Sequence, residues 1–311
     1  MRKLCDYFLP AALPANRVAT RIGLVSDTHM SARCDAFPAT LFDAFMGVDM
    51  ILHSGDVGEL WVLDALSTIA PVVAVHGNDD SEEAIGSLPY NQIVSAGGVR
   101  ILLTHAHYPN HLQEMASRRD DAWRPKLERR AAMAREVGAQ VAVFGHTHVP
   151  MTLSYDGVLL INPGALASPN EMLRQTQRTA AILYVRDDGV PFVRHVDLAA
   201  PEQVYVPVID WEAGFRAAHA AVSTPIITPA LAADLPHIIA LGRLIAPVQS
   251  EAAYFRLAQR CWAGDLDIIT HDDLFAELQE DESLSPAAVN AFSSMMAIAD
   301  ERMLIQLRHA S

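Results

Sequence analysis

Short apolar runs that end in polar residues recur along the first two thirds of the chain. The segments Thr20–Ser26, Ile51–Gly55 and Pro71–Val75 are apolar and rich in β-branched residues at consecutive positions, which is typical of strands buried on both faces of a sheet. Between them, Phe37–Gly47 and Gly58–Ile69 have the residue spacing of helices. This repeated strand–helix–strand order predicts an α/β fold.

The following segments predict further strands. Gln92–Ala96 and Val99–Thr104 flank the turn Gly97-Gly98 and are expected to form a hairpin, so the sheets should be mixed. A polar, arginine-rich stretch then leads to a helix expected at about Lys126–Val137. The remaining strands of this domain are predicted near Gln140–Phe144, Met151–Tyr155, Val158–Ile161, Thr179–Val185 and Phe192–Val196.

Beyond a linker predicted at Ala199–Pro207, the pattern is helical. Helices are expected at Trp211–Val222, Leu231–Leu244, Glu251–Trp262, His271–Glu280 and Pro286–Arg308. We therefore predict a first domain over residues 20–199 and a helical C-terminal domain or extension over residues 208–311. The last helix would begin after Ser285 as N-cap, and its apolar face is a candidate contact for a homo-oligomer.

Composition and charge argue against several classes of protein. A hydrophobic fraction of 51% predicts a sizeable core, and a net charge of −14, most of it after residue 199, argues against a nucleic-acid or anionic-membrane surface. Three scattered cysteines form no disulfide framework. Because the chain also has no run of 18 apolar residues and no secretory signal pattern, we expect no membrane segment and a cytoplasmic location.

Candidate metal-binding residues lie at the ends of five apolar runs. Each run is followed by side chains that commonly bind metals, namely Asp27, His29, Asp56, Asn78, His105, His146 and His148. One histidine after a strand is usually a loop or structural residue, but five such endings in this order are hard to obtain by chance. A carboxylate can bridge two cations, and imidazoles favour Mn²⁺, Fe²⁺, Ni²⁺ or Zn²⁺ over Ca²⁺.

The order Asp-x-His, Gly-Asp, Gly-Asn-x-Asp, Thr-His-x-His and Gly-His-x-His, with Asn162-Pro163-Gly164 downstream, resembles the calcineurin-like metallophosphoesterase superfamily. It is most similar to the small YfcE-like phosphodiesterase branch, over about residues 20–198. The resemblance implies two mixed β-sheets packed as a sandwich flanked by helices. It also implies one divalent ion held by Asp27, His29, Asp56 and His148, and a second held by Asp56, Asn78, His105 and His146.

The resemblance further implies a metal-dependent phosphoric ester hydrolase with a small phosphoester substrate. A phosphodiesterase is favoured, with two metal ions, most readily Mn²⁺, and a hydroxide that bridges them as nucleophile. Residues expected to take part in catalysis are Asp56, Asn78, Asp79 and His107. The alternatives are a phosphomonoesterase or protein phosphatase at the same metals, and a protein-binding scaffold on the same fold. The complete set of seven ligands argues against the scaffold.

One position departs from the superfamily pattern. Many members have Gly-Asn-His, whereas this chain has Asp79 after Asn78. Asp79 is either a cap of the next helix or a catalytic group. Without that histidine, general-acid catalysis of leaving-group departure should be weak, which favours diesters with good leaving groups. His107 either replaces it or supports the ligand His105.

Basic residues cluster between His105 and His146. Arg118, Arg119 and Arg124 either form a solvated helix face paired with acidic neighbours or bind a substrate phosphate. Asn162 is expected to hydrogen-bond to a ligand loop. His271-Asp272-Asp273 is interpreted as a helix N-terminus and not as a metal site.

Overall fold

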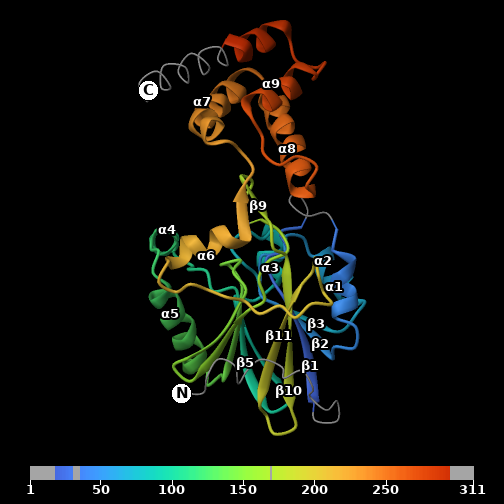
Figure 1. Cartoon of the computed structure of the whole chain (residues 1–311), viewed down its shortest axis with the longest axis vertical. Coiled ribbons are helices and arrows are strands. Elements are labelled where there is room, and N and C mark those ends of the chain that lie inside the picture. The colour runs from blue at the N-terminus through green and yellow to red at the C-terminus, as the bar shows by residue number, and fades with distance from the viewer. Residues whose placement is uncertain (1–17, 31–35, 169, 295–311) are drawn as a thin grey trace. The chain divides into compact units, whose positions relative to one another are not determined.

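A computed structural model describes residues 18–30, 36–168 and 170–294 of the 311-residue chain. The described residues form two compact units: residues 18–30 and 36–168 with 175–224, and residues 170–174 with 225–294 (Figure 1). Apart from residues 170–174, the second unit begins after residue 224, whereas the helical C-terminal region was expected from residue 208. Helix α6 (Gly214–Val222) belongs to the first unit, where Val222 is buried and Phe215 packs edge-to-face on Trp123.

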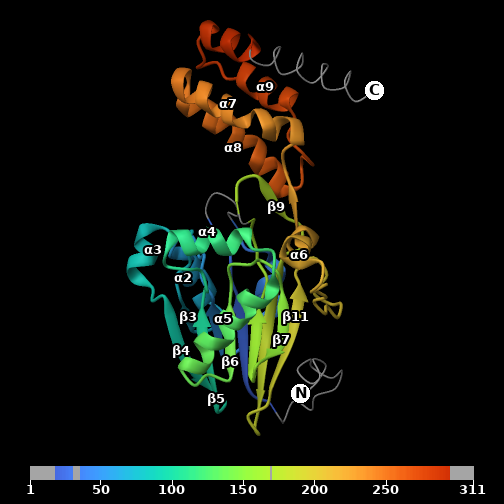
Figure 2. The same cartoon turned by 90° about the vertical axis from the view of Figure 1, so that its left-hand side faces the viewer.

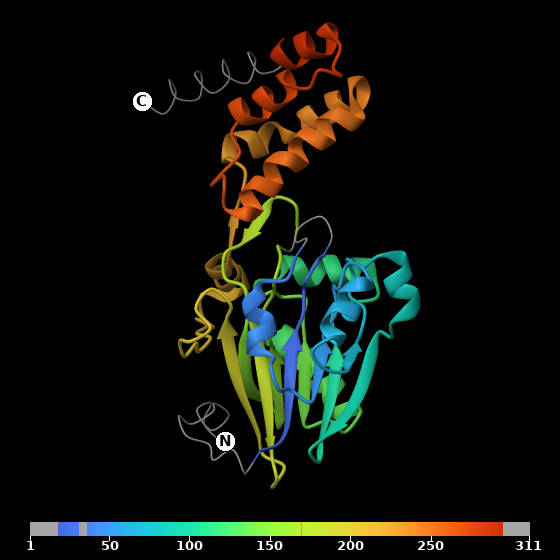
Figure 3. The ribbon, with the colours of Figure 1, turned by 90° about the vertical axis from the view of Figure 1, so that its right-hand side faces the viewer.

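The first sheet has five strands in the order β11-β10-β1-β2-β3. Its parallel strands are β1 (Val18–Val25), β2 (Met50–His53) and β3 (Val72–Ala74). The antiparallel strands β10 (Thr179–Arg186) and β11 (Pro191–Asp197) extend the other edge. Helices α1 (Ala39–Ala44) and α2 (Trp61–Ser67) cover its outer face (Figure 3).

The second sheet also has five strands, in the order β4-β5-β6-β8-β7. As predicted, β4 (Asn91–Ala96) and β5 (Val99–Thr104) form an antiparallel hairpin. Strands β6 (Val141–Phe144) and β8 (Val158–Asn162) run parallel to β5, and β7 (Met151–Tyr155) is an antiparallel edge. Helix α5 (Trp123–Glu136) covers the outer face (Figure 2).

Successive side chains of each strand point to opposite faces of its sheet, and together they form three apolar layers. Ile22 and Leu24 of β1 lie between the two sheets with Ile101 and Leu103 of β5. The outer face of the first sheet packs on α1 and α2, and that of the second sheet packs on α5. Because both faces of each sheet are buried, the strands are apolar at consecutive positions. The predicted sandwich of two mixed sheets flanked by helices is confirmed.

Two short helices lie near the carboxyl ends of the parallel strands. Helix α3 (Glu82–Ser87) is capped by Ser81, whose side chain accepts a hydrogen bond from the backbone of Ala84. Asp79 is therefore not the cap of this helix, and that alternative was wrong. Helix α4 (His111–Arg119) forms within the stretch predicted only as polar, with Asn110 as its N-cap. It lies across the strand ends (Figure 2).

The second unit is helical, as expected. Its helices are α7 (Pro229–Ile245), α8 (Pro247–Ala263) and α9 (His271–Gln279). Thr270 and Asp273 form a capping box at the start of α9, which confirms the helix-start interpretation of that cluster. Helical turns over residues 286–294 follow Ser285, whose hydroxyl accepts from the Ala288 backbone at 3.2 Å. The rest of the helix predicted to Arg308 lies outside the described residues.

Two smaller features complete the fold. Strands β9 (Leu173–Gln175) and β12 (Ser223–Pro225) form a two-stranded sheet. In the described part of the chain, no helix is both long enough and apolar enough to cross a membrane.

Candidate metal centre

Several residues that follow the carboxyl ends of the strands have positive φ angles, which is unusual outside glycine. Positive φ angles outside glycine cost conformational energy and cluster at functional sites. At this edge of the two sheets they occur at Asp27, His29, Asp56, Ala106, His146 and His148. Five of these six positions are predicted metal ligands. The strain is therefore located where the side chains must turn away from the strands.

Two glycines allow the strand-end loops to approach closely. A Cβ atom on Gly77 would lie 2.0 Å from the Asp56 Oδ1 atom and 2.5 Å from its backbone nitrogen. A Cβ atom on Gly145 would lie 2.7 Å from the Ser54 carbonyl oxygen and 2.8 Å from the Asp27 Oδ2 atom. Any larger residue at these positions would displace the loops that carry the carboxylates.

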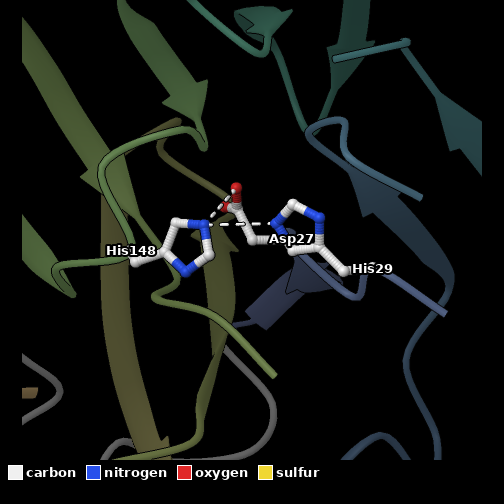
Figure 4. Close-up of side chains that lie close together, drawn as sticks. All are labelled: Asp27, His29 and His148. Atoms are coloured by element: carbon white, nitrogen blue, oxygen red, sulfur yellow. Dashed lines mark hydrogen bonds and ion pairs between the residues drawn. The ribbon is translucent and has the colours of Figure 1, made fainter. Parts of the chain in front are cut away.

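Asp27, His29 and His148 meet at one side of the centre (Figure 4). The Nε2 atom of His148 lies 3.2 Å from Asp27 Oδ1 and 3.3 Å from the Nε2 atom of His29. All three side chains are buried. Two imidazole nitrogens and a carboxylate oxygen that converge in this way form a ligand set suited to a divalent transition metal.

Asp56 occupies the middle of the centre. Its Oδ2 atom lies 3.1 Å from His105 Nε2 and 3.6 Å from His29 Nε2. Burial alone would raise the pKa of the Asp56 carboxyl, but His105 and His29 hold this pKa well below its usual value. Burial would lower the pKa of His105, yet Asp56 raises it to about 9. The buried carboxylates thus require positive charge beside them, which protons or metal ions can supply.

Asn78 and His105 add two further side chains of types that bind metals. The Oδ1 atom of Asn78 is buried and has no hydrogen-bond partner among the described residues, while its Nδ2 group donates to Asp79 at 2.9 Å. The Nδ1 atom of His105 lies 2.9 Å from the Ser54 carbonyl oxygen, which leaves Nε2 available to bind a metal ion. An amide oxygen and an imidazole nitrogen presented in this way fit a metal ion beside Asp56.

His146 lies beside His105 and contacts a residue that the sequence did not single out. The His105 and His146 ring centroids are 5.1 Å apart. The Nε2 atom of His146 lies 2.8 Å from an oxygen of Glu114, in helix α4. Burial raises the pKa of Glu114, but His146 and Arg118 together lower it well below its usual range. No motif marks Glu114, because its partner lies 32 residues away.

The two aspartates after Asn78 have different environments. Asp80 accepts hydrogen bonds from the backbones of Gly58 at 2.6 Å and Gly77 at 2.7 Å, so it joins two loops of the first sheet. Asp79 is exposed, and its carboxylate groups with His29 and Asp56 as a possible ligand set. Its backbone also donates to Asp56 Oδ1 at 2.8 Å. The structure thus places Asp79 at the rim of the centre.

His107 lies next to the centre but is held by aromatic neighbours. Its ring is 4.8 Å from that of Tyr90 and 5.5 Å from that of His105. Burial, with the nearby charge of His105, lowers the pKa of His107 to about 3. A ring that stays neutral in this way is a weak proton donor, so its catalytic role remains a prediction.

The basic segment is held mainly by local contacts. Arg118 pairs with Glu114 at 2.6 Å, and Arg124 pairs with Glu128 at 2.7 Å on an exposed face. Arg119 is exposed. None of these contacts brings the three arginines to a metal ligand directly, so phosphate binding by them remains a prediction. The Arg124 pair is of the kind expected for a solvated helix face.

Other basic side chains of α5 support the loops around the centre. Lys126 donates to the backbone oxygens of Ser117 and Asp120 at the end of α4, at 2.7 and 2.6 Å. Arg129 donates to the backbone oxygens of Ala106 and His107 at 2.6 and 2.9 Å. The basic run therefore fixes α4 and the loop that follows His105.

Asn162 supports the histidine loop of β6, as predicted. Its Nδ2 group donates to the Gly145 carbonyl at 3.0 Å and to the Thr147 hydroxyl at 2.9 Å. Its Oδ1 atom accepts from the backbone of Gly164 at 2.8 Å. The amide thereby connects the loops after β6 and β8.

Comparison with known proteins agrees with this geometry. The profile of the calcineurin-like phosphoesterase superfamily domain matches residues 20–188. A probable metallophosphoesterase of Methanocaldococcus jannaschii is 34% identical over 159 residues, covering 50% of this chain and 73% of that protein. A phosphodiesterase of the same organism is 26% identical over 157 residues, covering 46% of this chain and 82% of that protein.

Among solved structures, Vacuolar Protein Sorting 29 of Cryptosporidium parvum is 18% identical with a TM-score of 0.43, covering 58% of this chain and 98% of the other. The family assignment rests on the sequence matches, which include the strand ends described above. The chain belongs to the calcineurin-like phosphoesterase superfamily.

Proposed function

We propose that this chain is a phosphodiesterase that depends on two divalent metal ions, most readily Mn²⁺. The position of Asp56 carries the proposal. Its Oδ2 atom lies between His105 and His29, at 3.1 and 3.6 Å, where one carboxylate can serve two ions. The relative named as a phosphodiesterase gives independent support.

Two ligand sets would share Asp56. Asp27, His29 and His148 would hold one ion with it, and Asn78, His105 and His146 would hold the other. When bound, such ions supply Lewis-acid polarisation of the phosphoryl group and activation of water. Asp27 and Asp56 offset the charge of the ions, and the histidine and asparagine ligands fix their positions.

The exposed carboxylate of Asp79 favours diesters over monoesters. A phosphodiester carries one negative charge at neutral pH, whereas a phosphomonoester carries nearly two. Because Asp79 lies at the rim beside His29 and Asp56, its charge repels the monoester more strongly. The absence of a histidine at this position also limits proton donation, so substrates with good leaving groups are favoured.

The experiment that tests the function compares bis-p-nitrophenyl phosphate with p-nitrophenyl phosphate. Metal-free protein should hydrolyse neither, and protein restored with Mn²⁺ should hydrolyse the diester faster. Faster hydrolysis of the monoester would favour a phosphomonoesterase instead. Two bound ions without turnover of either substrate would contradict the proposal and favour a protein-binding role.

Replacing Asp79 by asparagine should shift this preference. The amide oxygen can still accept the hydrogen bond from Asn78, while the negative charge is lost. We expect kcat/KM for the monoester to rise about fivefold relative to the diester, which corresponds to about 1 kcal/mol of repulsion at an exposed position. Asp43→Asn, an exposed carboxylate in α1, is the matched control. An unchanged substrate ratio would exclude a role of Asp79 in selectivity.

A further inference from the structure

Glu114 is a buried carboxylate in a helix whose other residues are exposed or half-buried. It is only 5% exposed, and it is the buried residue of α4. One of its oxygens lies 2.8 Å from His146 Nε2 and 2.6 Å from Arg118 Nε. The other accepts from the backbone of Tyr108 at 2.9 Å. A carboxylate desolvated to this degree needs such partners, and here all three point to one location.

The contact with His146 determines which ring nitrogen carries the proton. A carboxylate can only accept hydrogen bonds, so the His146 Nε2 atom must be the donor. In the neutral ring, Nδ1 then has the free lone pair. His105 is fixed in the opposite sense, because its Nδ1 atom contacts the Ser54 carbonyl oxygen at 2.9 Å. Its Nε2 atom is left to face Asp56.

The surroundings hold Glu114 in place. Arg118 lies one helical turn further along α4 and pairs with the same oxygen. Asn110 caps the start of α4, and Lys126 binds two carbonyl oxygens at its end. The helix is thus held by hydrogen bonds at both ends, which limits the movement of the carboxylate. A residue that orients a metal ligand through a hydrogen bond must itself be held in place.

We propose that Glu114 is a positioning residue, which presents His146 Nδ1 as a ligand for the second metal ion. The inference rests on the proposed function, because His146 acts there as a metal ligand. A carboxylate partner both fixes the ring and increases its basicity as a ligand. The segment between His105 and His146 then contributes to the centre through α4, without providing a ligand itself.

The first test measures metal binding and not activity. Metal-free protein is titrated with Mn²⁺ by calorimetry, for the wild type and for Glu114→Gln. We expect the variant to bind one of two ions about 10- to 100-fold more weakly and the other with unchanged affinity. Glu128→Gln is the matched control, since Glu128 makes the same type of pair with Arg124 on the exposed face of α5. It should bind both ions as the wild type does.

A double-mutant cycle shows whether Glu114 acts through His146. If it does, Glu114→Gln should cause no further loss of affinity in a His146→Ala background. A full additional loss there, or wild-type affinity for both ions in the single variant, would overturn the inference. Wild-type protein that binds two ions but hydrolyses no diester would contradict only the proposed function.

A spectroscopic measurement needs no variant of Glu114. The ¹⁵N chemical shifts of the histidine rings in the metal-free wild type should show His146 with its proton on Nε2, and the His146→Ala spectrum identifies that signal. A neutral His146 with its proton on Nδ1 would overturn the inference. This result would stand even if Glu114→Gln failed to fold.

Discussion

Replacing Asp56 by asparagine should lower diester hydrolysis by about 10³-fold or more. A metal ion supplies several kcal/mol of transition-state stabilisation, and every 1.36 kcal/mol corresponds to a tenfold change in rate. Asparagine has the size of aspartate but cannot offset the charge of two ions. Its amide would also place a donor group opposite His105 or His29, which now lie 3.1 and 3.6 Å from the carboxylate. The measurement is kcat/KM with bis-p-nitrophenyl phosphate at saturating Mn²⁺.

Asp43→Asn makes the same chemical change on an exposed position of α1 and should retain wild-type turnover. Counting bound metal in both variants separates lost binding from lost chemistry. Asp56→Asn should bind fewer than two ions. Turnover within tenfold of the wild type would contradict the central position assigned to Asp56.

Replacing Gly77 by alanine should displace the same carboxylate although every proposed ligand residue is kept. The new methyl group would lie 2.0 Å from Asp56 Oδ1 and 2.5 Å from the Asp56 backbone nitrogen, so one loop must move. Overpacking of this kind costs about 1–3 kcal/mol of folding free energy, and a ligand displaced by about 1 Å can cost 10²-fold in rate. We therefore expect a lower unfolding temperature, weaker Mn²⁺ binding and about 10²-fold slower diester hydrolysis.

Gly86→Ala is the matched control for Gly77→Ala. Gly86 lies in helix α3, and a Cβ atom there would meet nothing within 4 Å. Alanine in a helix is more stable than glycine by up to about 1 kcal/mol, so this variant should be as stable as the wild type or slightly more stable. Normal metal binding by Gly77→Ala would show that the loops can accommodate a side chain there.

The sequence predicted the strands that precede the candidate ligands, because each candidate ligand follows a continuous apolar run. Buried strands such as β1 and β6 have a strong local signal, and within each sheet the parallel strands bring their carboxyl ends to the same edge. Asp27 and His148 are 121 positions apart yet share a contact at 3.2 Å. The resemblance to the superfamily, together with their common place after a strand, predicted that they meet.

Features that depend on tertiary contacts were not visible in the sequence. Helix α4 has little apolar periodicity, since Glu114 is its buried residue, and a buried carboxylate looks like a surface residue in a sequence. Helix α6 was assigned to the C-terminal domain because a helical pattern does not show on which unit a helix packs. Asp79 was considered as a cap although Ser81, two residues later, has that role; boundaries of short helices are weakly encoded.

The proposed ligands come from two different sheets. Asp27, His29, Asp56 and Asn78 follow strands of the first sheet, whereas the histidines at 105, 146 and 148 follow strands of the second. An ion held between them would act as a cross-link between the two layers of the sandwich. An ion that binds only the folded chain stabilises it by about 2.7 kcal/mol at a free concentration 100 times its Kd. The supply of metal would then govern the lifetime of the folded protein as well as its chemistry.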